Sequence, residues 1–179
     1  MRIIGGKYRG KKLYSPQDET IRPTSDKTRE AIFNILRSRL GYDFSNLSLL
    51  DIFCGSGAFS LEAISQGFKE STAIDIDTKL IKKNISLFPA EKDKIKIISA
   101  DAQNIPNLHK QFDVLFMDAP YNKGLTIPAL IQATKFLKNN TLCIIETHKS
   151  EKLILPNSYE FIEERKYGIS KITFATSKA

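Results

Sequence analysis

The sequence is poor in the residues that build disulfide frameworks and metal sites, since its 179 residues include only two cysteines and two histidines. Cys54 and Cys143 fall in different predicted strand regions, so we expect neither a disulfide nor a metal centre, and a reducing cytoplasm suits the chain. No apolar run approaches the ~20 residues of a membrane span, and the N-terminus lacks the apolar stretch of a secretory signal. We therefore expect a cytoplasmic protein with one sizeable core and no contact with membranes or metals.

Positive charge is concentrated at the N-terminus of this basic chain, whose formal net charge is +7. Residues 1–40 hold ten Lys and Arg against four acids, whereas the other 139 residues hold 17 against 16. A basic terminal patch is typical of nucleic-acid binding. A solvated basic face of a Lys-rich protein is an equally good interpretation of charge alone.

The first 40 residues predict a small hairpin followed by a helix. Glycines at 5, 6 and 10 separate short β-prone stretches within residues 1–14, which is typical of a hairpin. The helix has Ser25 or Asp26 as its cap, an apolar stripe at helical spacing and Gly41 as its stop.

From Leu47 onward the chain alternates predicted strands and helices. The predicted strands are 47–53, 71–75, 94–99, 112–118 and 141–148, and the predicted helices are 58–66, 78–88 and 125–138. Residues 159–167 and 169–177 predict a closing antiparallel hairpin. This alternation predicts an α/β fold with a doubly wound, mostly parallel seven-stranded sheet of Rossmann-like type. Ligands bind such sheets at the carboxyl ends of the strands, where the strand order reverses.

Small and acidic residues lie at the carboxyl ends of the first four parallel strands, at the predicted ligand-binding edge. Glycine there lets the backbone approach a ligand closely. An acid after the second strand can accept both ribose hydroxyls of a nucleoside, and one after the third can accept an adenine amino group. The residues are Asp51 with Gly55-Ser56-Gly57 after the first strand, then Asp75, Asp101 and the run Asp118-Ala119-Pro120-Tyr121.

The turn after the first strand discriminates between nucleoside cofactors. A dinucleotide fold expects a third glycine where this chain has Ser60. Asp51 would repel a pyrophosphate but suits a cationic amino acid. S-adenosylmethionine carries an ammonium and a sulfonium and no phosphate, so the turn favours it over NAD.

These motifs resemble those of class I methyltransferases that act on amino groups. In addition, residues 1–13 (MRIIGGKYRGKKL) and 21–34 (IRPTSDKTREAIFN) resemble the bacterial 16S ribosomal RNA guanine-N2 methyltransferase family. The likeness runs over nearly the whole chain and implies transfer of a methyl group from S-adenosylmethionine to guanine N2. The family usually has Pro where this chain has Ala119, which still supplies the backbone carbonyl although the loop is less rigid.

The resemblance implies two units and three sets of contact residues. We expect residues 1–40 to contact RNA and residues 41–179 to bind S-adenosylmethionine, in a chain that acts as a monomer. The expected cofactor contacts are Asp51, Phe53, Gly55, Ser56, Gly57, Asp75, Ile76, Asp101, Ala102 and Asp118. The expected RNA contacts are Arg2, Lys7, Tyr8, Arg9, Lys11, Lys12, Arg22 and Thr24, on ribosomal RNA or the small ribosomal subunit. The expected catalytic residues are Asp118, Ala119, Pro120 and Tyr121.

The expected chemistry is positioning of a weakly nucleophilic amine. Asp118 and the Ala119 carbonyl each accept an N–H of guanine N2, which turns the nitrogen lone pair toward the methyl group, while Tyr121 stacks on the base. No strong general base is required, and we interpret His109 and His148 as surface or strand-edge residues. The target base must be unstacked to reach such a site.

Several alternatives share parts of this pattern. A DNA adenine-N6 methyltransferase or a protein glutamine methyltransferase uses similar amino-group geometry. A non-catalytic RNA-binding module on the same fold and a nucleotide-dependent oxidoreductase are more distant alternatives. Cys54 lies in the turn after the first predicted strand, which we expect to bind the cofactor and call the cofactor turn. We therefore interpret Cys54 as a packing residue and not as a nucleophile.

Overall fold

The computed structural model describes residues 1–16 and 25–178. The helices are α1 (Asp26–Leu40), α2 (Ala58–Ser65), α3 (Lys79–Ile85) and α4 (Thr126–Ala133), with 3-10 turns η1 (Gly6–Tyr8), η2 (Pro89–Lys94) and η3 (Thr134–Phe136). The strands are β1 (Ser48–Ile52), β2 (Glu70–Asp75), β3 (Ile95–Ser99), β4 (Phe112–Asp118), β5 (Leu137–His148), β6 (Tyr159–Tyr167) and β7 (Ser170–Ser177). Across these two ranges, no helix is both long and apolar enough to cross a membrane.

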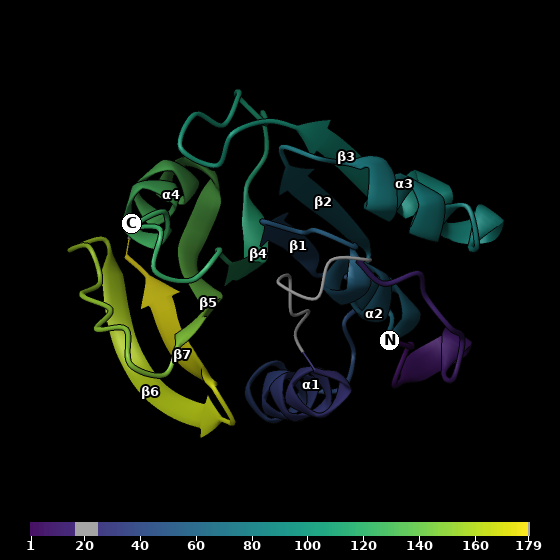
Figure 1. Ribbon diagram of the computed structural model, residues 1–179, viewed down its shortest axis with the longest axis horizontal. Helices are drawn as coiled ribbons and strands as arrows, with labels where there is room; N and C mark the ends of the chain where they lie inside the picture. The colour runs from purple at the N-terminus through teal and green to yellow at the C-terminus, as the bar shows by residue number, and fades with distance from the viewer. Residues whose placement is uncertain (17–24, 179) are drawn as a thin grey trace.

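All seven strands form one sheet in the order β3-β2-β1-β4-β5-β7-β6 (Figure 1). The five strands from β3 to β5 are parallel, and β7 pairs antiparallel with both β5 and β6. The predicted fold class is therefore confirmed. The strand order reverses between β1 and β4, which makes the carboxyl ends of these two strands the expected ligand-binding point.

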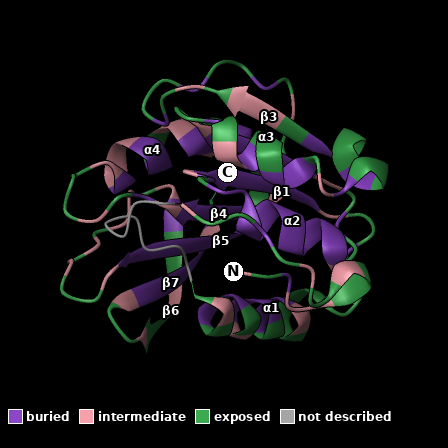
Figure 2. Ribbon diagram, turned by 45° about the vertical axis from the view of Figure 1, so that its right-hand side comes forward, coloured by how far each residue is buried: buried purple, intermediate pink, exposed green. Residues whose placement is uncertain are grey.

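Two apolar clusters cover the two faces of the sheet. Leu49 of β1 belongs to the cluster under α1, α2 and α3, whereas the next residue, Leu50, belongs to the cluster under α4. This alternation follows from the period of two along a strand. Every residue of α2 is buried (Figure 2). The ring of Phe59 on α2 stacks on Phe116 of β4 at a centroid distance of 3.7 Å, which fixes α2 on the sheet.

The first sixteen residues form an arm that contains less β-structure than the predicted hairpin. The arm reverses direction through η1, and Arg2 and Lys12 make a single antiparallel bridge. The strands do not extend because the Gly5-Gly6 segment packs directly on the end of α2. A Cβ at Gly6 would lie 1.8 Å from the Ser65 carbonyl oxygen, and Gly6 has a φ of +72°.

A buried carboxylate on α2 anchors this arm. The Glu62 side chain is fully buried and accepts hydrogen bonds from the backbone amides of Ile4 and Gly5, each at 2.8 Å. Arg29 of α1 is also buried, with its Nε 3.8 Å from the same carboxylate, and it donates to the Arg2 carbonyl at 2.6 Å. The arm, α1 and α2 are thereby tied together by one buried ion pair.

Several element ends differ from the predictions; the helix predicted over 78–88, for example, is α3 over Lys79–Ile85. As predicted, Ser25 caps α1, since its Oγ accepts from the Thr28 amide, and Gly41 ends the helix with a φ of +85°. The helix predicted over 125–138 instead ends at Ala133. Strand β5 already begins at Leu137, because Leu137 pairs with Phe112 of β4 and this pairing overrides the helical pattern.

Candidate active site

Four of the predicted site segments meet at one edge of the sheet. Asp51 and Asp118 lie on the neighbouring strands β1 and β4, Asp75 ends β2, and Asp101 follows β3. The Asp75 carboxylate accepts a hydrogen bond from the Gly55 amide at 2.8 Å, so the first two strand ends are in direct contact. The structure thus brings the predicted residues together at the reversal of strand order.

The turn after β1 combines an open position with a tightly packed one. Phe53, Gly55 and Gly57 all have positive φ values, of 62°, 51° and 73°. A Cβ on Gly57 would lie 2.4 Å from Cγ1 of Ile81, so the packing of α3 requires glycine there. Among residues 1–16 and 25–178, no atom lies within 4 Å of the corresponding Cβ position at Gly55, which leaves space for a ligand beside the backbone. Ser56, between the two glycines, is buried.

Asp51 has an unusual environment for a carboxylate. Its side chain is fully buried, and Oδ2 accepts a 2.6 Å hydrogen bond from Ser60, which in turn lies 2.9 Å from the Ser71 hydroxyl. Within the part of the chain that the structure describes, Oδ1 is buried without a hydrogen-bond partner. Burial raises the pKa of Asp51 to about 7, and the nearby charge of Asp75 acts in the same direction. A cationic ligand would give Oδ1 a partner of opposite charge and would favour the ionised carboxylate.

The residues after β2 and β3 present both polar and apolar groups. Asp75 also accepts from the Asp77 amide at 3.2 Å, and the exposed Asp101 accepts from the Gln103 amide at 2.9 Å. Ile76 is 71% exposed, so its apolar side chain is open to contact with a flat ring. Ala102 is buried.

The segment after β4 is fixed by its tyrosine. Asp118 is half-buried, Ala119 is buried and Pro120 is exposed. The Tyr121 hydroxyl donates to Oε1 of Glu146 at 2.8 Å, and Ser170 Oγ lies 2.9 Å from that hydroxyl. Burial raises the pKa of Tyr121 further above its usual range, so the hydroxyl remains a donor.

The sequence analysis did not predict the two residues that bind the Tyr121 hydroxyl, Glu146 and Ser170. Glu146 is buried near the end of β5, and Ser170 begins β7 and donates to the same carboxylate oxygen at 2.7 Å. His148, interpreted as a strand-edge residue, has its ring centroid 5.7 Å from that of Tyr121. One signal for Glu146 was available, because it lies near the carboxyl end of the strand predicted over 141–148 and such ends meet at one sheet edge; the structure pairs it with Asp118.

Comparison with known proteins identifies the family. A family model described as "Conserved hypothetical protein 95" matches residues 1–176. The chain belongs to this family. It is 33% identical over 177 residues to "Ribosomal RNA small subunit methyltransferase D" of Haemophilus influenzae, covering 94% of this chain and 90% of that protein. The Bacillus subtilis protein "Putative rRNA methyltransferase YlbH" is 29% identical, with 96% of each chain covered.

Solved structures of methyltransferases share the whole fold of this family member. "Putative methyltransferase yhhF" from Escherichia coli superposes with a TM-score of 0.82 at 25% identity, covering 100% of this chain and 98% of that one. The fold, the family and the relatives together make this chain a class I methyltransferase, a class that depends on S-adenosylmethionine.

Part of the basic arm of this methyltransferase is engaged within the protein. Lys7 Nζ and the Tyr8 hydroxyl bind the same oxygen of Glu91, at 2.7 and 2.8 Å. The hydrogen bond from Lys7 holds the pKa of Glu91 at about 2, with help from Lys94. Lys11 donates to the Leu87 carbonyl. These contacts fix the arm against η2 and the end of α3.

Two other cations of the arm, Arg9 and Lys12, are free, within the described part of the chain, of contacts that would prevent them from binding a ligand. Over residues 1–16 and 25–178, the Arg9 and Lys12 side chains have neither a hydrogen bond nor an ion pair, and both are exposed. Arg2 pairs with Asp26 at 3.5 Å across an exposed surface, where such a pair contributes little. Arg22 and Thr24, also predicted to contact RNA, lie outside the described residues.

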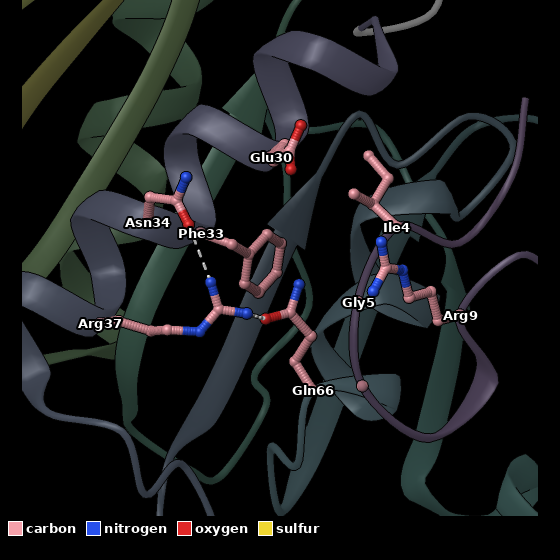
Figure 3. Close-up of a pocket in the computed structure, with 9 residues that line it drawn as sticks. Ile4, Gly5, Arg9, Glu30, Phe33, Asn34, Arg37 and Gln66 are labelled. Carbon is pink, nitrogen blue, oxygen red and sulfur yellow. Dashed lines mark hydrogen bonds between the residues drawn. The ribbon is translucent and has the colours of Figure 1, made fainter.

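A polar cavity of about 290 Å³ lies at the other end of α2, beside Gln66. Figure 3 shows the residues that line it. The Arg37 guanidinium reaches across it to the side chains of Asn34 and Gln66. Because α2 begins at the cofactor turn and rises about 1.5 Å per residue, its eight residues separate the cavity from that turn. The residues that line it are Ile4, Gly5, Gly6, Arg9, Glu30, Phe33, Asn34, Arg37 and Gln66.

Proposed function

We propose that this methyltransferase transfers the methyl group of S-adenosylmethionine to the exocyclic N2 of a guanine in small-subunit ribosomal RNA. The observation that carries the proposal is the placement of the run Asp118–Tyr121 beside Asp51 at the reversal of strand order. The names of the relatives, which refer to ribosomal RNA, support the substrate class.

The residues present fit the cofactor. The buried charge of Asp51 and its unpartnered Oδ1 suit a cationic amino group nearby, and the open space at Gly55 admits the ligand beside Phe53, Ser56 and Gly57. Asp75 would accept from the ribose hydroxyls. Ile76 and Ala102 would contact the adenine ring, whose amino group Asp101 would accept. When bound, S-adenosylmethionine supplies an electrophilic methyl group on a sulfonium.

The segment after β4 would then hold the target amine. Asp118 accepts one N–H and the Ala119 carbonyl accepts the other, so the nitrogen lone pair faces the methyl donor. Pro120 shapes the corner, and the Tyr121 ring stacks on the base. The bonds to Glu146 and Ser170 keep this ring in place before the base arrives. Less side-chain entropy is therefore lost when the base binds.

RNA would reach this edge along the arm and α1. Phosphates would bind Arg9 and Lys12 first, since these cations are not engaged within the described chain, with Arg2, Lys7, Lys11, Arg22 and Thr24 adding further contacts and Tyr8 a surface for a base. The protein would act as a monomer on ribosomal RNA or the small subunit in the cytoplasm, where its two buried, free cysteines stay reduced.

The test is incubation with labelled S-adenosylmethionine and undermethylated small subunits, followed by nucleoside analysis. Label in N2-methylguanosine is the expected result. Asp118→Ala should abolish transfer, whereas Asp93→Ala, at an exposed acid on η2, should not. Label on adenine N6 or on glutamine would support the alternative amino-group enzymes. RNA binding without any transfer would indicate a non-catalytic module.

A further inference from the structure

An exposed aromatic side chain lies where the arm leaves the protein core. Tyr14 is 44% exposed, and its ring makes a cation–π contact with Lys83 of α3, whose Nζ lies 3.9 Å from the ring centroid. Bases of single-stranded RNA stack on such exposed rings irrespective of sequence, and a cation at the ring strengthens the contact. Neither residue takes part in the site described above.

The backbone of Tyr14 is held rigidly, although its ring is exposed. Asn84 of α3 is fully buried and accepts from the Tyr14 amide at 2.8 Å, and it donates to the Tyr14 carbonyl at 3.0 Å. The same side-chain amide donates to the Ser56 carbonyl in the cofactor turn at 2.8 Å. A single buried residue therefore fixes the aromatic ring next to the turn that would hold the methyl donor.

The helix beside Tyr14 presents a uniformly basic face. Lys79, Lys82 and Lys83 are exposed and spaced three and four residues apart, which places them on one side of α3. Within the described ranges no acid forms an ion pair with any of these three lysines. Of the two acids that follow on η2, Glu91 is already bound by Lys7 and Lys94, and Asp93 is exposed.

We propose that Tyr14 and the lysines of α3 form a binding surface for single-stranded RNA: a base stacks on Tyr14 while Lys79, Lys82 and Lys83 bind the adjoining phosphates. This surface deepens the proposed function, on which it rests, because it would guide the strand that carries the target base to the cofactor turn. Asn84 acts as the positioning residue that keeps the surface in register with that turn.

The test measures the affinity of a fluorescent single-stranded ribosomal RNA fragment by anisotropy over a salt series, without cofactor. Tyr14→Leu should weaken binding roughly five- to hundredfold, the range for loss of one stacked base, whereas Tyr14→Phe should bind like the wild type. Lys83→Gln should lower the slope of log affinity against log salt by about 0.7. Lys69→Gln is the matched control, because this exposed lysine precedes β2 at the opposite edge of the sheet.

Each outcome is decisive for the surface. Wild-type affinity in both Tyr14→Leu and Lys83→Gln would overturn it, as would equal losses in Lys69→Gln. A variant Tyr14→Leu that loses cofactor affinity but keeps RNA affinity would also overturn it and assign the ring to the cofactor. Wild-type protein that binds RNA through this surface but methylates no guanine would refute the proposed function alone, and the nucleoside analysis makes that distinction. Equal melting temperatures show that each variant is folded.

Discussion

The pH dependence of cofactor affinity follows from the burial of Asp51. Burial raises the pKa of Asp51 to about 7, so a substantial fraction of the molecules carries a neutral Asp51 near neutral pH. A cationic amino acid binds best to the ionised carboxylate, so binding must expel a proton below pH 7. Affinity for S-adenosylmethionine should therefore fall as the pH is lowered and level off above pH 7.

The magnitude follows from proton linkage. For a free pKa of about 7 and a much lower pKa in the complex, affinity changes by at most about 25-fold between pH 7.5 and 5.5. Asp51→Asn keeps an oxygen that can accept from Ser60 but carries no charge. It should bind the cofactor roughly ten- to hundredfold more weakly at pH 7.5, since a hydrogen bond to a charged group is worth about 1.5–3 kcal/mol, and its affinity should be nearly independent of pH.

Isothermal titration calorimetry in two buffers of different ionisation enthalpy measures both the affinity and the protons released. Asp51→Asn should be no less stable to unfolding than the wild-type protein at pH 7.5. The raised pKa means that ionisation of Asp51 lowers folding stability as the pH rises from 3.8 through 7, and asparagine removes this effect. Asp77→Asn is the matched control at an exposed acid beside the site. The reasoning would be refuted if the wild-type protein bound the cofactor equally well at pH 5.5 and 7.5. It would also be refuted if the affinity of Asp51→Asn depended on pH as steeply as that of the wild type.

Three further variants test other parts of the structure. Asp118→Ala should retain near-normal cofactor affinity by calorimetry but give no transfer in the labelled-cofactor assay, and full activity would contradict its role. Tyr121→Phe keeps the ring but removes the hydroxyl bonds, so kcat should fall roughly five- to tenfold, about 1 kcal/mol, with little change in cofactor affinity; an unchanged kcat would exclude a positioning role. Gly6→Ala should lower the melting temperature more than Gly10→Ala does, because both have positive φ but only Gly6 faces a backbone oxygen; equal losses would show that the contact is unimportant.

The sheet and the strand-end residues could be predicted because their signals are local. Strand β1 is buried along its whole length and therefore appears in the sequence as an apolar run, and the residues after it mark the turn. The same logic located Asp75 and Asp118. Each prediction needed only the order of the elements and the rule that parallel strands end at one edge.

The features that were missed depend on contacts between distant segments. Ser60 was interpreted only as the lack of a glycine, but its hydroxyl binds Asp51 across the helix–strand interface. The partners of Tyr121 lie 25 and 49 residues away, on strands whose register no local pattern specifies. Likewise, the arm forms one bridge because glycine packs against α2, which a propensity for hairpins does not reveal.

The anchoring of the arm by Glu62 has a consequence for studies with shortened proteins. A chain that began at Ser25 would lose both amides that bind Glu62, and the carboxylate would keep only the Gln66 side-chain amide at 2.6 Å and the more distant Arg29 guanidinium at 3.8 Å among its partners in the described part of the chain. A buried charge that loses two of its donors destabilises the helix that carries it. That helix begins at the cofactor turn, so deletion of the arm would impair catalysis by disturbing the scaffold, and point substitutions are the sounder way to measure what the arm contributes to substrate capture.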